Sequence, residues 1–241
     1  VKCNPLPFVL DALYEGGIRH FDTASIAEIE LVGRRFPDAH GHFMHPVKSP
    51  QAIRRAFDEF GVRHYVIDHA AEIEKMIAVL GNDRREATVL VRLATPSKSA
   101  KFNLSAKFGA APDKTVQLLR ALVDAGFQPG LCFHVGSQCL DPEAWTLALD
   151  LVDSVLRQSG VAIRCLDVGG GFPTSYVGET PPPLEAFIDA IARGVAKLAL
   201  PADCVLMCEP GRALVAPAMS VVARVELATD EAVHLNDGIY G

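Results

Sequence analysis

The sequence predicts a (β/α)8 barrel followed by the start of an antiparallel β domain. Short apolar runs alternate with longer stretches of helical periodicity, which is typical of parallel β/α units. The apolar runs end at eight places, the number of strands that a closed barrel needs, and nearly every run stops at an ionisable side chain. In a barrel all these ends converge on one face, whereas in a doubly wound open sheet, the alternative, only those at the switch point would meet.

Each predicted strand is located by the polar residue at which its run stops. In chain order these residues are Lys2, Asp22, His45, Asp68, Arg92, His134, Asp167 and Glu209. Helices are predicted between them, and several begin with proline in the first turn and an acid soon after, which are ordinary helix-start signals. The predicted helices span residues 6–15, 26–36, 50–60, 70–80, 112–125, 142–159 and 183–199.

The pattern changes after Arg212. Residues 213–228 are predicted as extended chain and 233–240 as another strand and turn, with no helix between them. We therefore expect a barrel domain at 1–212 and the beginning of a C-terminal β domain at 213–241. The chain starts without Met, inside what resembles a strand-to-helix turn, and it ends in a turn. It is therefore expected to be an internal piece of a longer protein.

The composition argues against several functional classes. The chain has 241 residues, 49% of them hydrophobic, which is enough for a large buried core. A net charge of -6 without basic blocks argues against nucleic acid as a partner, and no apolar run is long enough to span a membrane. Six cysteines without a Cys-x-x-Cys pair indicate reduced thiols in a cytoplasmic protein.

Two adjacent strand ends carry the strongest functional signal. The run that stops at Asp167 opens into three glycines at 169–171, and the next run ends in Glu-Pro-Gly-Arg at 209–212. Glycine backbone lets amide N–H groups approach an anion, and barrel enzymes often bind a phosphate after their seventh and eighth strands. Glu209 would repel a phosphate unless the ligand also carried a cation, such as a protonated pyridine nitrogen. With an amine at Lys2, pyridoxal phosphate meets every requirement.

Six short motifs extend this signal over the whole chain. They are Val1-Lys2-Cys3-Asn4-Pro5, Phe21-Asp22-Thr23-Ala24-Ser25, His134-Val135-Gly136-Ser137-Gln138, Asp167-Val168-Gly169-Gly170-Gly171-Phe172-Pro173, Glu209-Pro210-Gly211-Arg212 and Asn236-Asp237-Gly238-Ile239-Tyr240-Gly241. In order and spacing they resemble the barrel-fold (fold type III) pyridoxal-phosphate decarboxylases. The resemblance is strongest to ornithine decarboxylase and its lysine/ornithine relatives, because diaminopimelate decarboxylases usually have Leu after the glycines.

The resemblance implies roles for the matching residues. Lys2 would bind the cofactor as a Schiff base, His134 would stack on its ring, and Glu209 would pair with its ring nitrogen. The other residues that the resemblance assigns to the cofactor site are the phosphate contacts Ser137 and Gly171 with Gly170, Gly211 and Arg212 beside them, and the residues Asp22 and Arg92 at the barrel mouth. Structural ion pairing is the alternative for the last two. No metal site is implied.

The resemblance also implies an activity and partners. The expected reaction is decarboxylation of a basic amino acid, ornithine to putrescine in polyamine biosynthesis, or lysine to cadaverine. A homodimer with shared active sites is expected, and the cysteine that acts as general acid, with the acids that bind the distal amine, would lie beyond Gly241. The alternatives are a diaminopimelate or arginine decarboxylase, a non-catalytic regulatory homologue, and a racemase or cofactor carrier on the same barrel.

Two further features have other interpretations. His40, His42 and His45 form a His-x-His-x-x-His pattern, and zinc is an alternative there. Strand alternation, however, places His45 on the opposite face, and no acid or cysteine completes a ligand set. Residues 97–109, rich in Lys and Ser, are predicted as a long loop over the barrel mouth, which is either a mobile lid or a solvated surface loop.

Overall fold

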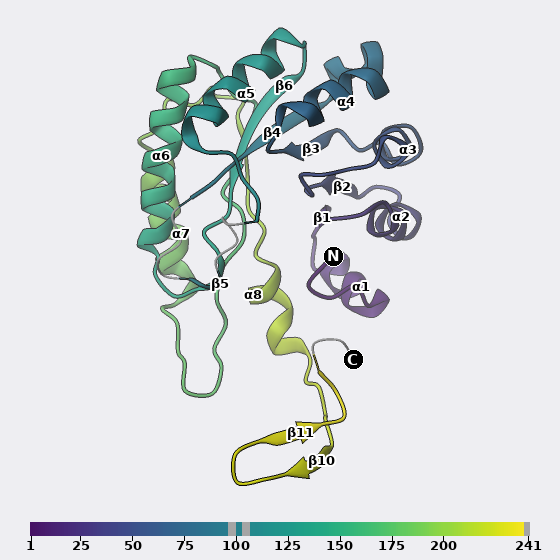
Figure 1. Ribbon diagram of the computed structural model, residues 1–241, viewed down its shortest axis with the longest axis vertical. Helices are drawn as coiled ribbons and strands as arrows, with labels where there is room; N and C mark the ends of the chain where they lie inside the picture. The colour runs from purple at the N-terminus through teal and green to yellow at the C-terminus, as the bar shows by residue number, and fades with distance from the viewer. Residues whose placement is uncertain (96–99, 103–106, 239–241) are drawn as a thin grey trace.

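The computed structural model describes residues 1–95, 100–102 and 107–238, with only the backbone described for 100–102. Within these ranges, seven parallel strands form one curled sheet with helices along its outer side (Figure 1). The strands, in sheet order, are β1 (His20–Thr23), β2 (His40–Phe43), β3 (His64–Ile67), β4 (Thr88–Leu93), β6 (Gln128–Phe133), β8 (Cys165–Asp167) and β9 (Val205–Met207). This order confirms the predicted parallel β/α architecture and brings the carboxyl ends of all seven strands to one side.

The seven predicted helices are all present in the described ranges. They are α1 (Pro7–Glu15), α2 (Ile26–Arg35), α3 (Pro50–Phe60), α4 (Ala70–Leu80), α5 (Pro112–Asp124), α6 (Glu143–Ser159) and α7 (Leu184–Val195). Local signals define their ends: the hydroxyls of Ser25 and Ser49 cap α2 and α3, and Gly61 ends α3 in the left-handed conformation. None of the described helices is long and apolar enough to cross a bilayer.

The N-terminal strand prediction is wrong. Lys2 lies in a turn closed by a hydrogen bond from the Asn4 N–H to the Val1 carbonyl at 3.0 Å, not at the end of a strand. Consequently, in the described part of the chain no strand lies between β9 and β1 to close the sheet. A separate difference from the prediction is the short helix η1 (Gly81–Glu86), which precedes β4.

The prediction of extended chain over 213–228 is also wrong in its first part. Helix α8 (Gly211–Val215) and the 3-10 turn η2 (Ala216–Ala218) occupy it. Ala213 and Leu214 are strong helix formers, which favours a helix over extended chain at these positions. The predicted antiparallel pair follows as β10 (Val225–Ala228) and β11 (Val233–Leu235), below the barrel in Figure 1. The domain boundary at 212 stays a prediction, since α8 runs across it.

A second, antiparallel pair lies at the barrel mouth and was not predicted. Strand β5 (Ala100–Phe102) pairs with β7 (Ser137–Cys139), which follows directly after β6. The predicted loop at 97–109 falls largely outside the described residues, and neither interpretation of it is tested. Where its described end returns to the barrel, the Gly109 N–H donates a 3.0 Å hydrogen bond to the Asp68 carboxylate.

An aromatic cluster anchors the segment that follows the three glycines. Phe172, Trp145 and Phe187 are almost fully buried, with the Trp145 ring 4.9 Å from Phe172 and 5.5 Å from Phe187 between centroids. The Trp145 indole N–H donates to the carbonyl of Val168 at 3.2 Å. Helices α6 and α7 thereby hold the loop after β8 in place, because Trp145 and Phe187 pack around Phe172.

Histidines line the inner face of the first three strands. His42 is 3% exposed; a ring nitrogen of His20 lies 2.9 Å from its Nε2, and its Nδ1 has no hydrogen-bond partner among the described residues. Burial and the neighbouring rings of His64, His20 and His40 lower the pKa of His42 to about 3. No three or more His, Cys, Asp or Glu side chains in the described ranges are arranged to hold a metal ion.

We expect His42 to make the fold sensitive to acid. The pKa of His42 in the folded protein, about 3, lies below the ordinary value of 6.5, so its contribution is intact above pH 6.5 and is lost as the pH falls towards 3. Relative to His42→Leu, the wild-type free energy of unfolding should therefore fall by up to about 1.4 kcal/mol per pH unit in this window. Denaturant unfolding at several pH values measures this difference.

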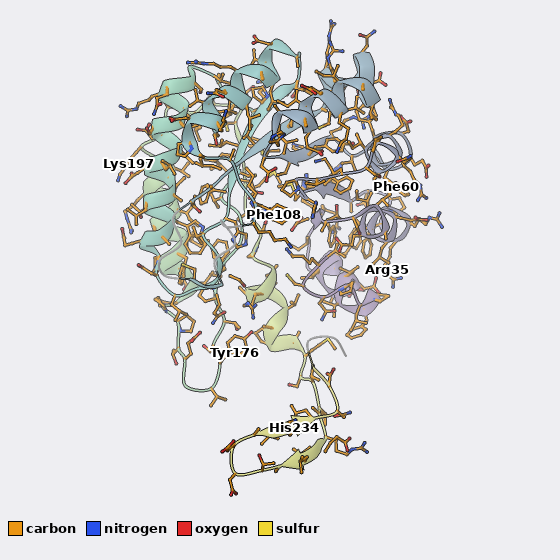
Figure 2. All side chains as sticks on the ribbon, in the orientation of Figure 1. Arg35, Phe60, Phe108, Tyr176, Lys197 and His234 are labelled. Atoms are coloured by element: carbon orange, nitrogen blue, oxygen red, sulfur yellow. The ribbon has the colours of Figure 1, made fainter. Side chains whose placement is uncertain are left out.

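The matched control is His234→Gln, because His234 is exposed on the hairpin (Figure 2). It should follow the wild-type profile. If the difference between wild type and His42→Leu does not change between pH 6.5 and 4, the argument from burial is wrong.

Candidate active site

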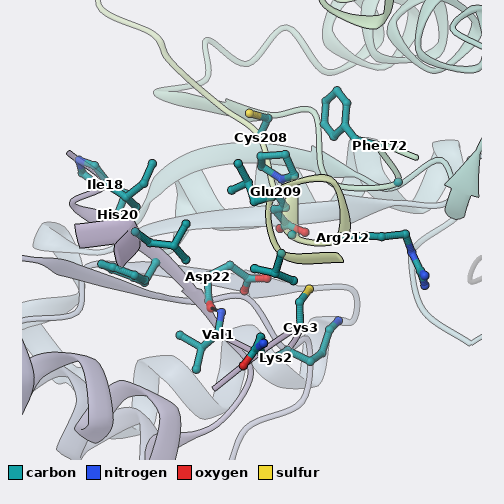
Figure 3. Close-up of a pocket in the computed structure, with 18 of the residues that line it drawn as sticks. Val1, Lys2, Cys3, Ile18, His20, Asp22, Phe172, Cys208, Glu209 and Arg212 are labelled. Carbon is teal, nitrogen blue, oxygen red and sulfur yellow. Dashed lines mark hydrogen bonds between the residues drawn. The ribbon is translucent and has the colours of Figure 1, made fainter. Parts of the chain in front are cut away.

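A cavity of about 290 Å³ lies at the carboxyl ends of the strands (Figure 3). The N-terminal turn, β1, and the segments after β6, β8 and β9 form its wall. Eight of the ten predicted cofactor-site residues line it, namely Lys2, Asp22, His134, Ser137, Gly171, Glu209, Gly211 and Arg212. The other two, Gly170 and Arg92, do not line it, although Gly170 lies against two residues that do. The fold therefore brings together residues that are more than two hundred positions apart, such as Lys2 and Arg212.

The glycine loop after β8 is held by backbone contacts on both sides. The Gly169 N–H donates to the Asp167 carboxylate at 2.8 Å, and the Gly169 carbonyl accepts from the Glu209 N–H at 2.9 Å. Gly169 has φ 67°, and a Cβ there would lie 1.9 Å from the Phe133 carbonyl oxygen. A Cβ at Gly171 would lie 2.4 Å from a backbone oxygen of the loop after β6. Both positions require glycine because two backbones approach too closely for any side chain.

Gly169→Ala is expected to lower the free energy of unfolding by about 3 kcal/mol or more, because backbone cannot move aside as a side chain can. Gly178→Ala is the matched control: Gly178 also has positive φ, 77°, but nothing lies within 4 Å of its Cβ position. Its cost should be about 1 kcal/mol. Equal losses in the two variants, measured by urea unfolding, would mean that the contact with Phe133 does not matter.

Three carboxyl groups meet between β1, β8 and β9. Burial raises the pKa of Asp22 to about 7, and the charge of Glu209 adds to this effect. Burial likewise raises the pKa of Asp167 to about 6, although hydrogen bonding opposes part of the shift. The pKa of Glu209 is raised well above its ordinary value by burial and by the charge of Asp167. These three carboxyl groups therefore bind protons more readily than isolated carboxyl groups do. Together they favour a ligand that carries a positive charge or donates a proton.

His134 presents a neutral imidazole to the cavity. Its Nδ1 accepts a 2.9 Å hydrogen bond from the Gly136 N–H, which places the ring proton on Nε2. Burial, with repulsion by Arg92 and Lys2, lowers the pKa of His134 to about 3. A Cβ at Gly170 would lie 3.1 Å from Nε2 and 2.7 Å from the carbonyl oxygen of Glu209. The His134 ring is therefore uncharged, and the absence of a side chain at Gly170 leaves space beside it.

Arg212 supplies the donors for an anion at the other side of the cavity. Its guanidinium donates to the Tyr176 hydroxyl at 2.5 Å and to the Ser137 hydroxyl at 3.2 Å, while its buried Nε has no hydrogen-bond partner among the described residues. Gln138, at φ 55°, ties the loop that carries Tyr176 through two hydrogen bonds to the backbone of Thr174. An unsatisfied guanidinium N–H in a cavity is suited to an oxyanion.

Sequence reasoning missed two residues of this arrangement. Asp167 was located as a strand end but was given no role, although its place after a buried strand and before the glycines is a usable signal. Tyr176 carries no sequence signal, because it approaches Arg212 only through the folding of the loop after β8. Arg92 does not line the cavity, but its charge lowers the pKa values of Asp167 and Glu209 and partly opposes the effect of burial.

Comparison with known proteins places this geometry in a family. Residues 1–216 match the family model described as the pyridoxal-binding domain of pyridoxal-dependent decarboxylases. The chain is 35% identical over its whole length to lysine/ornithine decarboxylase of Selenomonas ruminantium and 32% identical to ornithine decarboxylase of Saccharomyces cerevisiae. It spans 62% and 52% of the lengths of those two proteins.

Solved structures show the same similarity. The crystal structure of lysine/ornithine decarboxylase from Vibrio vulnificus in complex with putrescine superimposes with a TM-score of 0.78 at 32% identity, covering 99% of this chain and 63% of that one. The crystal structure of a mutant protein named SrLDC in complex with pyridoxal phosphate (PLP) superimposes with a TM-score of 0.82 at 32% identity, covering 99% of this chain and 62% of that one. The predicted barrel fold is thereby confirmed.

Proposed function

The chain belongs to the pyridoxal-dependent decarboxylase family, and from this we propose that it forms the cofactor-binding part of an enzyme that decarboxylates a basic amino acid. The observation that carries the proposal is the shared cavity, in which the amine of Lys2, the carboxyl of Glu209 and the guanidinium of Arg212 meet. An amine for an aldehyde, an acid for a ring nitrogen and donors for a phosphate are the three requirements of pyridoxal 5'-phosphate.

The residues present fit this cofactor. Among the described residues the buried Nε of Arg212 has no hydrogen-bond partner, as expected of a donor reserved for a phosphate oxygen. The backbone at Gly171 has no room for a side chain, because a Cβ would lie 2.4 Å from the Gly136 oxygen, whereas at Gly211 the near atom is the sulfur of the exposed Cys3 side chain, at 2.3 Å. When bound, pyridoxal phosphate supplies an electron sink for the electron pair that remains at Cα after carbon dioxide leaves.

In this proposal each residue of the chain has a defined task. Lys2 provides the amine that bonds to the cofactor aldehyde, and Glu209, a strong base because of its raised pKa, shares the proton of the ring nitrogen. The imidazole of His134, kept neutral by its low pKa, would contact the ring, position it and exclude water. Ser137 and Gly171 would contact the phosphate, with Gly211 and Arg212 beside them.

The substrate and partners follow the relatives. We place ornithine first and lysine second, because the relatives reported above are ornithine and lysine/ornithine decarboxylases. The products would be putrescine and cadaverine, and the general acid would come from outside residues 1–241. A homodimer with shared sites in the cytoplasm is part of the same proposal; all six cysteines, each within the described ranges, are free thiols, which suits a reducing compartment.

The test uses the full-length protein loaded with pyridoxal phosphate and supplied separately with ornithine, lysine, arginine and diaminopimelate. Carbon dioxide release and the amine product are measured for each. We expect the highest kcat/KM with ornithine, followed by lysine. A protein that binds the cofactor but releases carbon dioxide from none of the four would overturn the decarboxylase assignment and favour a non-catalytic homologue.

A further inference from the structure

We propose that Asp167 is a positioning residue that acts through Glu209: its carboxylate lies behind Glu209 and holds the proton on the ring nitrogen of the bound cofactor. This inference rests on the proposed cofactor site and assigns that site a residue that no motif argument identified. The evidence is the placement of Asp167, its hydrogen bonding and the balance of charge around it.

The placement of Asp167 is inside the barrel. Glu209 lines both the cavity that holds Lys2 and a second cavity of about 590 Å³ between the inner faces of the strands, whereas Asp167 lines only the second. Glu209 thus separates Asp167 from the cofactor cavity. The strands hold the two acids in register, since the Val168 N–H donates to the Met207 carbonyl and the Glu209 N–H to the Gly169 carbonyl, both at 2.9 Å.

The hydrogen bonding of Asp167 is incomplete. Its Oδ1 accepts the Gly169 N–H at 2.8 Å, but its Oδ2 has no N–H or hydroxyl donor among the described residues although the residue is 0% exposed, and the other group that hydrogen-bonds to Asp167 is the carboxyl of Glu209. A buried carboxylate oxygen without a donor is unfavourable and needs an explanation. The explanation is that the carboxyl groups of Asp167 and Glu209 share one proton. The negative charge then belongs to the pair and not to either residue alone.

The local charge is negative. Asp22 from β1 is the third acid of the group, and Glu28 from α2 is a fourth that acts on Asp22. The cations that act on the group are the guanidinium of Arg92 from β4, the amine of Lys2 and the amino group of Val1, and the thiols of Cys132 and Cys208 border it. Four acids therefore face three cations. A ring nitrogen that carries a proton would supply the missing positive charge, and Asp167 would strengthen its hold on that proton without contact.

Asp167→Asn is the direct test, because asparagine keeps the oxygen that accepts the Gly169 N–H, removes the charge and puts an NH2 group in place of Oδ2. In the cofactor-free full-length protein at pH 8, we expect the variant to be more stable than wild type, with a thermal midpoint higher by roughly 2 °C or more. Its advantage should shrink towards pH 5, where the wild-type acid binds its proton. In the same protein, the dissociation constant of pyridoxal phosphate should rise roughly tenfold or more.

The pH at which the absorption spectrum of the bound cofactor changes provides a third measurement, and it should move down in the variant. The matched control is Asp124→Asn, an exposed acid on α5, which should leave all three quantities unchanged. A variant that is less stable than wild type at pH 8, or that binds the cofactor as tightly as wild type, would overturn the role of Asp167. If the wild-type protein itself binds no pyridoxal phosphate, the proposed function fails, and this inference fails with it.

Discussion

Replacing Lys2 with alanine in the full-length protein is expected to abolish covalent retention of pyridoxal phosphate and to lower kcat by about 10³-fold or more. Lys2 lines the cavity that also contains His134 and Glu209, so its amine can reach a ligand bound between them. Removing this amine removes the group that forms the covalent bond to the aldehyde. The fold itself should change little, because Lys2 is exposed in a turn.

Two variants separate the chemistry of Lys2 from its charge. Lys2→Arg keeps the positive charge but cannot form the bond, so it should be as inactive as the alanine variant. Lys197→Ala removes an exposed lysine at the outer surface of the barrel (Figure 2) and should behave as wild type. Borohydride reduction of the holoprotein followed by peptide mapping should give one labelled peptide, which contains Lys2. Label on another lysine would contradict the assignment.

Glu209→Gln is expected to change activity and stability in opposite directions. Activity should fall by about 10²–10³-fold, because glutamine cannot share the proton of a ring nitrogen as a carboxylate does. In the absence of cofactor, the variant should be more stable than wild type at neutral pH. The pKa of Glu209 is raised in the folded protein, so the wild type loses stability as the pH rises above the ordinary value of 4.5, and glutamine removes this loss.

The measurements are kcat with ornithine and thermal unfolding of the cofactor-free protein between pH 5 and 8. Glu74→Gln is the control, since Glu74 is an exposed acid on α4. Lower stability of Glu209→Gln at neutral pH, with normal stability of the control, would show that Glu209 supports the fold and that its carboxyl carries no unfavourable charge. Functional sites commonly contain groups, such as a buried charge, that lower stability but are needed for activity.

The helices were predicted well because their signals are local. Proline at the start of α3 and α5, the hydroxyl of Ser49 and the glycine at position 61 each act within one turn of the chain. The two errors also have local causes. At Lys2 a hydrogen bond within residues 1–4 closes a turn where a strand end was predicted. The apolar residues after Arg212 were interpreted by hydrophobicity, although alanine and leucine are strong helix formers.

The sequence by itself determined which side chains stand at strand ends, and therefore that Asp22, His134 and Glu209 would approach one face of a parallel barrel. Only the tertiary structure decided how these groups affect one another. The proton affinity shared by Asp22, Asp167 and Glu209, and the contact of Tyr176 with Arg212, depend on distances between segments far apart in the chain. Local propensity acts over one turn or one strand, whereas burial and charge act through space, so the curling of the sheet had to be known before the chemistry of the site could be described.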